Sequence, residues 1–415
     1  MTVLLRHSGD LPARGEYQSW VALGNFDPLL DPDLRGASAA ALEDAFDRAG
    51  ETWFTLARDM GREQTADLAH TPACVANASD FGVMLAWASL VESWGRESRR
   101  TLAICNDPWL FRHLAQQPGV EAGQRPPLAR REILLMLRGL AARLAVALRM
   151  AVAHITSRQL IRDAPRGGAA LLVYNHPRSM PSGHDAYFGD LLRRLSGLSR
   201  IVHTDGNPQT AARLGVPLHA FGRLRDLFRL PGARWRPSTQ LINGPYGWLI
   251  RRSAALEGGG GQAGMIAWQQ ACQRRWLTMT RPSVIAWPWE NHAWERDLVR
   301  AARHLGIRTI GYQHSVIGRQ MFNYAPKSNP DGLESIPDLI PCSGQATLDQ
   351  LSDWSMPRER LSIGGALRFP SAASPRYEPS APVFMALPFD GKVAAQMVAA
   401  ARTVPAVRFA VRDHP

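Results

Sequence analysis

The chain alternates short apolar runs with segments whose apolar residues recur every three or four positions. The stretch 283–315 shows this pattern most clearly. Its first run, 283–287, is mostly apolar and predicts a buried strand of a parallel sheet. Residues 292–304 have helical spacing, and Gly306 follows where a helix would end. Residues 307–312 predict the next strand, so the whole stretch is a strand–helix–strand unit.

The same alternation extends along the rest of the chain. Further strands are predicted at 101–105, 169–174, 199–203, 337–342, 360–364, 383–387 and 407–411. Helices are predicted at 38–59, with Ser38 as the N-cap, and at 84–94, 131–160, 187–195, 219–229, 344–354 and 391–402. Because strands that alternate with helices are typical of parallel sheets, the sequence predicts an α/β fold.

The length of 415 residues and a linker-like segment indicate more than one domain. Residues 370–382 are rich in Pro, Ser and Ala, as linkers often are. We expect an N-terminal Rossmann-like domain with helical insertions over 1–369 and the start of a C-terminal one over 383–415. A lone strand–helix–strand unit cannot bury its faces, so we expect the C-terminal domain to be truncated.

Polar residues follow both strands of the 283–315 unit. Glu290 comes after the first strand and His314 after the second. The carboxyl ends of strands form the ligand crevice of open α/β sheets, so we expect both side chains to face one crevice. Nearby tryptophans would raise the pKa of Glu290, which suits a general base; alternatively, Glu290 caps the following helix. His314 either polarises a hydroxyl or binds a donor anion, or it only bridges loops.

A second polar group follows the strand at 169–174. It contains His176, Arg178, His184 and Asp185. Two histidines, an arginine and an aspartate exceed what a turn requires. We therefore take Asp185 as a second candidate base and Arg178 as an anion-binding residue. The two histidines are candidates for binding the acceptor or an anion, and the alternative is that they only cap or pack.

The chain is strongly basic, with a net charge of +12 and a pI of about 10.3. This charge implies anionic partners. It is spread through Arg-rich helices, and no RNA-binding motif or zinc-finger spacing occurs, so nucleic acid is the weakest candidate. The predicted helix 131–160 is either a domain helix with a solvated basic stripe or a basic surface that lies on an anionic bilayer.

Cysteine spacing and the length of apolar runs bear on the compartment. The four cysteines, Cys74, Cys105, Cys272 and Cys342, form no CxxC pair, which argues against a zinc site and for a cytosolic chain with free thiols. No uncharged apolar run reaches about 18 residues, so no transmembrane helix is predicted. The first ten residues are too short and polar for a signal peptide.

Several motifs occur in a characteristic order. They are DAYFGD at 185–190, GYQHS at 311–315, PDLIPCSG at 337–344, ERLSIGGALRF at 359–369 and RDHP at 412–415. This order resembles bacterial surface-carbohydrate biosynthesis proteins with a GT-B-type glycosyltransferase fold. It is most similar to O-antigen and capsule enzymes that share features with Kdo and sialic acid transferases. The resemblance covers mainly residues 170–415.

The resemblance implies two motif pairs with roles in the site. The first is His414-Pro415, which in such enzymes holds the phosphate of a CMP-sugar. The second is Gln313-His314, which follows a strand of the N-terminal domain. The resemblance also implies two Rossmann-like domains that face a cleft, and a transfer that needs no bound metal. The absence of a DxD pattern with a second acidic cluster fits such a mechanism.

Other residues are candidates for holding the donor's phosphates in a GT-B-type site. Backbone amides at helix N-termini and basic side chains supply this grip. The candidates are the helix that starts near Gly344, the turn at Gly364 and Gly365, and Arg368. Arg368 alternatively caps the interdomain linker.

Together these expectations describe a glycosyltransferase of O-antigen, capsule or lipopolysaccharide biosynthesis. Its donor would be a nucleotide sugar, with CMP-Kdo or a related nonulosonate favoured, and no cofactor is expected. Its acceptor would be a lipid-linked saccharide. We expect a cytoplasmic protein on the inner face of the membrane, bound through basic helices and without a nucleic-acid partner. The alternatives are a nucleotide-sugar 2-epimerase-like enzyme on the same fold and a non-catalytic polysaccharide-assembly scaffold.

Overall fold

The computed structural model combines helices with parallel sheets, which confirms the predicted α/β class. The residues that it describes are 3–24, 26, 28–73, 79–96, 100–369, 378–388 and 390–413. The chain divides into two compact units, Met1–Phe369 and Pro370–Pro415.

Every strand pairing in both units is parallel. The strands are β1 (Val3–Arg6), β2 (Ser19–Ala22), β3 (Thr101–Ile104), β4 (Val120–Ala122), β5 (Ala169–Val173), β6 (Leu198–Val202), β7 (Val216–Pro217), β8 (Val284–Pro288), β9 (Arg308–Tyr312), β10 (Ile340–Cys342), β11 (Leu361–Ile363), β12 (Val383–Ala386) and β13 (Phe409–Arg412).

The α-helices vary from single turns to one of 30 residues. They are α1 (Ala39–Arg48), α2 (Gly50–Gly61), α3 (His70–Ala73), α4 (Phe81–Trp94), α5 (Pro108–Leu114), α6 (Leu128–Ser157), α7 (Leu191–Arg194), α8 (Pro208–Leu214), α9 (Leu224–Leu227), α10 (Thr239–Ile242), α11 (Gly247–Gly258), α12 (Gln262–Thr280), α13 (Ala293–His304), α14 (Gln345–Asp353) and α15 (Gly391–Arg402).

The first unit contains two separate parallel sheets. The N-terminal sheet has the order β2-β3-β1-β4 and packs against α1, α2, α4 and α5 through one apolar core. The central sheet has the order β7-β6-β5-β8-β9 and a second core. This arrangement differs from the single Rossmann-like domain that the sequence predicts over 1–369. The strands of the N-terminal sheet are only three or four residues long, which leaves little apolar pattern to detect.

The central sheet changes direction between β5 and β8. From β5 the chain proceeds to β6 and β7 on one side, then returns to place β8 and β9 on the other. Backbone hydrogen bonds from Gly311 to Leu339 and from Gln313 to Pro341 connect β9 to the segment that carries β10. Such a switch point opens a crevice at the carboxyl ends of the strands, and the strands 283–287 and 307–312 predicted from sequence correspond to β8 and β9 on this side.

The predicted helix 38–59 is two helices in the structure. It breaks into α1 and α2 at Ala49, directly before Gly50, a residue type that lowers helix stability. The halves pack against different partners, α1 against α4 and α2 against α3. Ser38 is the N-cap residue of α1, as predicted, but its side chain makes no capping hydrogen bond.

The predicted helix 219–229 is also interrupted. A 3-10 turn, η4 (Leu218–Phe221), is followed by Gly222 and then by α9. A Cβ atom on Gly222 would lie 2.2 Å from the ring of Trp268, so only glycine allows the backbone to pass this close to the buried indole. Tertiary packing at this point overrides the helical pattern of the sequence.

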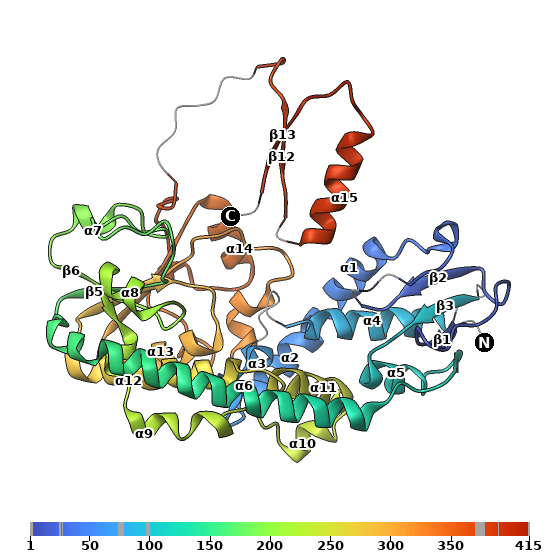
Figure 1. Cartoon of the computed structure of the whole chain (residues 1–415), viewed down its shortest axis with the longest axis horizontal. Helices are drawn as coiled ribbons and strands as arrows, with labels where there is room; N and C mark the ends of the chain where they lie inside the picture. The colour runs from blue at the N-terminus through green and yellow to red at the C-terminus, as the bar shows by residue number, and fades with distance from the viewer. Residues whose placement is uncertain are drawn as a thin grey trace. The chain divides into compact units, whose positions relative to one another are not determined.

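Helix α6 lies along α11 and α12 and packs against both (Figure 1). The helices approach closely because Gly139 has no side chain: a Cβ atom there would lie 1.8 Å from the carbonyl oxygen of Gly258. The buried Arg143 donates hydrogen bonds to the carbonyl oxygens of Gly258, at 2.6 Å, and Pro231, at 2.9 Å. One face of α6 is therefore fully used in packing.

The second unit is the strand–helix–strand motif β12–α15–β13 that the sequence predicts. Asp390 caps α15 by accepting hydrogen bonds from the backbone N–H groups of Lys392 and Val393. No residue of α15 is buried. His414, Pro415 and most of the predicted linker lie outside the described residues.

We predict that Tyr312→Phe lowers the free energy of unfolding by about 1–2 kcal/mol, because it removes two buried hydrogen bonds. The Tyr312 hydroxyl donates to the carbonyl oxygen of Gly365 at 2.9 Å and accepts from the N–H of Leu367 at 3.0 Å. Urea denaturation measures the change. Tyr17→Phe is the matched control, because no hydrogen bond of its hydroxyl is recorded among the described residues. Equal stability of the two variants would contradict the prediction.

Candidate active site

Side chains from four neighbouring strands meet at the switch point of the central sheet. Tyr174 follows β5 and His203 follows β6. Glu290 and His292 follow β8, and His314 follows β9. The Tyr174 and His203 rings stack with centroids 4.6 Å apart. Nε2 of His314 lies 3.7 Å from Oε1 of Glu290. The two residues that the sequence places at one crevice are thus in proximity.

The turn that carries Glu290 has an unusual backbone. Asn291 has a φ of 57°, a left-handed conformation that asparagine tolerates better than most residues. Its buried amide donates to the carbonyl oxygen of Asn323 at 2.6 Å and to Oδ1 of Asn329 at 3.3 Å. The Asn323 amide in turn donates to the carbonyl oxygen of Glu290 at 2.7 Å. These bonds hold the turn in one conformation, as strained turns at functional sites require.

Glu295, at the start of α13, also stabilises the turn that carries Glu290. Its carboxyl oxygens accept hydrogen bonds from the backbone N–H of Glu290, at 3.0 and 3.2 Å, and of His292, at 3.1 Å. Burial raises the pKa of Glu295 to about 8, and the charge of Glu290 acts in the same direction. Glu295 is therefore mainly a neutral acid at neutral pH. Sequence reasoning missed it, although its spacing from His292 is that of a capping box.

Glu290 and His292 form a hydrogen-bonded ion pair, with Oε2 and Nε2 2.7 Å apart. Burial alone would raise the pKa of Glu290, but the hydrogen bond and charge of His292 outweigh it and lower this pKa. Burial alone would lower the pKa of His292, but the hydrogen bond to Glu290 and the charge of Glu290 raise it. Glu290 is therefore ionised at neutral pH, and the pair favours the protonated form of His292.

Two expectations about Glu290 are therefore wrong. Its pKa is lowered, not raised, because His292 offsets burial. The alternative role, capping α13, belongs to Glu295, which accepts the N–H of His292.

His314 is a neutral imidazole at neutral pH, because burial lowers its pKa to about 4. Its ring lies edge-on to Tyr187, with centroids 4.8 Å apart. Its Nδ1 atom has no hydrogen-bond partner among the described residues. A neutral histidine beside an ionised carboxylate can donate a hydrogen bond to a hydroxyl group that enters the crevice, or accept one from it.

Arg368 lies close to this cluster. Its guanidinium group is 5.0 Å from the centre of the Tyr187 ring, and its charge contributes to the lowered pKa of Glu290. The Tyr312 hydroxyl fixes the preceding backbone by its bonds at Gly365 and Leu367. No ion pair of Arg368 is recorded among the described residues. It is a cation available to an anionic group, which is the role the sequence suggests.

Asp185, a candidate base from the sequence, has a structural position. The residue is wholly buried. Its Oδ1 accepts the backbone N–H groups of Tyr187, at 2.9 Å, and Phe188, at 3.1 Å, and its Oδ2 accepts the hydroxyl of Ser179 at 3.3 Å. Asp185 thus holds its own loop together. This tight loop also shortens the predicted helix 187–195 to α7.

The other residues of this loop lie in different surroundings. Nδ1 of His184 is 3.0 Å from Oδ1 of Asp190, so His184 pairs with a side chain of its own loop. His176 accepts the N–H of Arg178 at 3.1 Å, and its ring contacts Tyr187 edge-on at 5.9 Å. Arg178 is exposed. His176 therefore borders the cluster.

Gln313 has a structural position. It is wholly buried; its amide donates to the carbonyl oxygen of Ser315, and its Oε1 accepts the hydroxyl of Ser343 at 3.4 Å. It joins the loops after β9 and β10 and does not reach the crevice as a ligand-binding residue would.

The three candidate glycines occupy turns near the end of the first unit. Gly344 directly precedes α14, and the space where a Cβ atom would lie is open. A Cβ atom on Gly364 would lie 2.6 Å from Pro341, so that glycine permits close packing of β10 and β11. Gly365 has a φ of 81°, which allows the turn that leads to Arg368. A role in phosphate binding stays a prediction for each.

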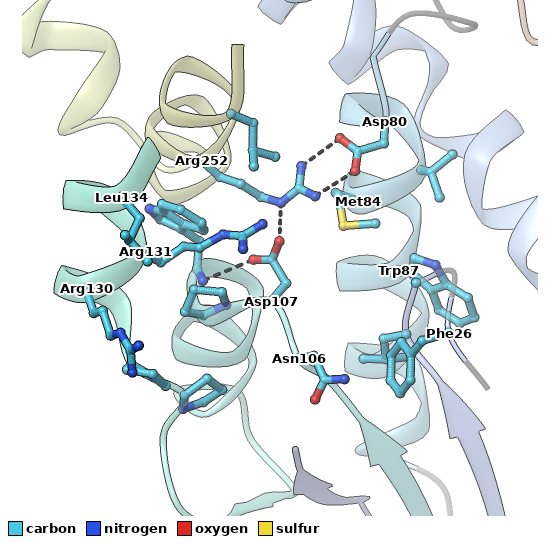
Figure 2. Close-up of a pocket in the computed structure, with 18 of the residues that line it drawn as sticks. Phe26, Asp80, Met84, Trp87, Asn106, Asp107, Arg130, Arg131, Leu134 and Arg252 are labelled. Carbon is cyan, nitrogen blue, oxygen red and sulfur yellow. Dashed lines mark hydrogen bonds and ion pairs between the residues drawn. The ribbon is translucent and has the colours of Figure 1, made fainter. Parts of the chain in front are cut away.

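A pocket of about 850 Å³ lies elsewhere, beside the N-terminal sheet. Figure 2 shows Arg130 and Arg131 on one side of it and Phe26 and Trp87 on the other. At its inner end, Arg252 makes two hydrogen bonds to Asp80, at 2.6 and 2.7 Å, and one to Asp107 at 2.6 Å (Figure 2). The sequence analysis did not anticipate this pocket, because its residues come from segments far apart in the chain.

A smaller pocket of about 360 Å³ lies between these two regions. Asp80 lines both pockets. At the other end, His70 lines the smaller pocket, and its ring contacts that of His292 edge-on, with centroids 5.7 Å apart. The larger pocket and the crevice with Glu290 are therefore linked through shared or touching residues.

Comparisons with known proteins do not assign this site, because no family model, curated protein or solved structure matches the chain. Within the described residues, no group of three or more His, Cys, Asp or Glu side chains is arranged to hold a metal ion. Nor does that part of the chain include a helix with the length and apolarity needed to cross a membrane. The three cysteines that it includes are free thiols.

We predict that Glu295→Gln changes how stability depends on pH. The pKa of Glu295 rises from 4.5 to about 8 on folding. The contribution of this group is complete below the unfolded pKa and is lost as pH rises through the folded value. The glutamine keeps an acceptor oxygen but cannot ionise. The free energy of unfolding of the variant should therefore rise relative to that of the wild type between about pH 5 and pH 8.

Urea denaturation across that pH range tests this prediction. Glu359→Gln, at an exposed position, is the matched control and should change the pH dependence little. A stability difference between Glu295→Gln and the wild type that stays constant with pH would show that Glu295 ionises normally in the folded protein. Glu295→Ala should be less stable than Glu295→Gln, since it leaves both N–H groups without an acceptor.

Proposed function

We propose that this chain is a glycosyltransferase of bacterial surface-polysaccharide assembly. It would transfer a sugar from a nucleotide donor to a lipid-linked saccharide, with CMP-Kdo or a related nonulosonate as the favoured donor. The observation that supports this most is the ionised Glu290 held beside His292, His314 and Arg368 at the switch point of a parallel sheet. Switch points are where open α/β folds bind their substrates.

The cluster supplies the groups that glycosyl transfer requires. Glu290 is ionised at neutral pH, so its carboxylate can take the proton of an acceptor hydroxyl as the new C–O bond forms. The neutral His314 can orient the same hydroxyl. The bond from the sugar to the donor's phosphate breaks, and the phosphate leaves with the electron pair. Arg368 would then stabilise the negative charge of the leaving phosphate, without a metal ion.

The lowered pKa of Glu290 makes it a weaker base. His292 compensates for this weakness in the proposal, because it can give up a proton after Glu290 has accepted one. Proton transfer to Glu290 neutralises the carboxylate and would leave the cationic His292 without its ion-pair partner. His292, which is partly exposed, can then release its own proton to solvent, because its raised pKa rests on its hydrogen bond to the ionised Glu290. The pair works as one acid–base unit in this proposal.

The second unit has a separate role in the proposal. The motif β12–α15–β13 would form the first part of a GT-B-type nucleotide-binding domain, and His414 would contact the donor's phosphate there. The protein would act in the cytoplasm at the inner membrane, where lipid-linked acceptors are available. The resemblance in motif order supports these assignments.

We predict that Glu290→Gln lowers the transfer rate by a factor of about 10²–10⁴, the usual contribution of a general base. Affinity for the nucleotide sugar should change little, because the amide retains the shape of the side chain. Transfer assays and calorimetric titration measure the two quantities. Glu359→Gln serves as the control with normal activity. Unchanged turnover of Glu290→Gln would remove this residue from the mechanism.

Thermal shift against CMP-, UDP-, GDP- and TDP-sugars tests the donor class. A ligand at about 100 times its Kd stabilises the folded protein by about 2.7 kcal/mol. We expect CMP-sugars to give the largest shift. No shift with any nucleotide sugar would favour the scaffold alternative. An acceptor-independent change in the nucleotide sugar would favour the epimerase.

A further inference from the structure

Helix α6 has an apolar face that the protein does not cover. Its buried residues, among them Leu135, Gly139, Arg143, Val146 and Met150, lie on one side. The large apolar residues on the opposite side are each 44–71% exposed: Ile133, Leu137, Leu140, Leu144, Leu148, Val152 and Ile155. This stripe is about 33 Å long, at 1.5 Å per residue. Soluble proteins rarely expose a continuous apolar surface of this size.

Arginines accompany the stripe along one edge. Arg131, Arg138 and Arg149 are exposed and recur at spacings of seven and eleven residues, which places them in one row, about 120° around the helix from the centre of the stripe. Glu132 is the one acidic residue in the sequence of α6. An apolar stripe with a basic edge is the pattern of helices that lie in the surface of anionic membranes.

A neighbouring segment extends the same surface. Helix α9 contacts α6; Leu224 in α9 is 52% exposed, and Phe228, directly after α9, is 86% exposed. Arg223, Arg225 and Arg229 are exposed beside them. Two elements that are separate in sequence thus repeat the same combination of exposed apolar and basic side chains.

We propose that α6 and α9 form a membrane-docking surface, on which α6 lies in the plane of an anionic phospholipid bilayer. The apolar stripe would enter the boundary between headgroups and acyl chains, and the arginines would extend to lipid phosphates. A second copy of the chain is the weaker occupant, because pairing would bring two basic edges together in a protein of net charge +12.

This surface also adjoins the larger pocket. Arg130, Arg131 and Leu134 at the start of α6 line that pocket, and all three are exposed. A bilayer-bound α6 would therefore hold the pocket beside the lipid surface. Membrane docking stands independently of glycosyl transfer and does not involve Glu290.

Co-sedimentation of the full chain with vesicles tests the proposal. The wild type should bind vesicles that contain phosphatidylglycerol and should bind pure phosphatidylcholine at least about tenfold more weakly, because basic residues add electrostatic attraction to anionic lipid. The triple variant Leu137→Gln, Leu144→Gln, Leu148→Gln should lose about tenfold or more of the binding to anionic vesicles. Arg131→Gln with Arg149→Gln should reduce the preference for anionic lipid.

The control removes three exposed leucines elsewhere: Leu11→Gln, Leu29→Gln, Leu195→Gln. It should bind vesicles as the wild type does, and circular dichroism should show all variants folded. The proposal is overturned if the wild type does not bind anionic vesicles, or if the α6 triple variant binds them as the wild type does. It is also overturned if ultracentrifugation shows a dimer that the α6 variant abolishes while vesicle binding is absent.

Discussion

The carboxyl group of Glu295 and the amide of Asn291 determine the geometry of the candidate site. The first accepts two backbone N–H groups of the turn after β8, and the second ties that turn to Asn323. Glu290 projects from this turn, so its position depends on side chains that never enter the crevice. A buried carboxyl group would normally destabilise the protein, and two hydrogen bonds offset that cost only if the turn keeps this conformation.

The local elements around the site were predictable because their signals are local. Strand, helix and strand over 283–315 have clear periodicity, and Gly306 ends α13 with a φ of 71°. The electrostatics were not predictable in the same way. The sign of the Glu290 pKa shift depends on the orientation of His292, which sequence spacing does not give. The structural position of Asp185 was not predictable for a similar reason, since nothing local shows that its carboxylate turns back to its own loop.

Helix α6 shows a different limit of sequence patterns. Its apolar residues occur around most of the helix, so periodicity leaves open which face is buried. Close approach to Gly258 at Gly139 decides this, because it brings Arg143 into the protein and leaves Leu144 and Leu148 outside. The solvated basic stripe considered from sequence is thus only an edge, and the exposed face is mainly apolar. Long-range packing, in this helix as in the site, determines what the local pattern means.

The central claim is that Glu290 and His292 form one charged acid–base pair. NMR titration of the protein labelled at histidine Cε1 tests it most directly, with His292→Gln to assign the signal. The pKa of His292 should lie above 6.5 in the wild type and should fall when Glu290 is replaced by glutamine. A His292 pKa at or below 6.5 that is insensitive to this replacement would contradict the account.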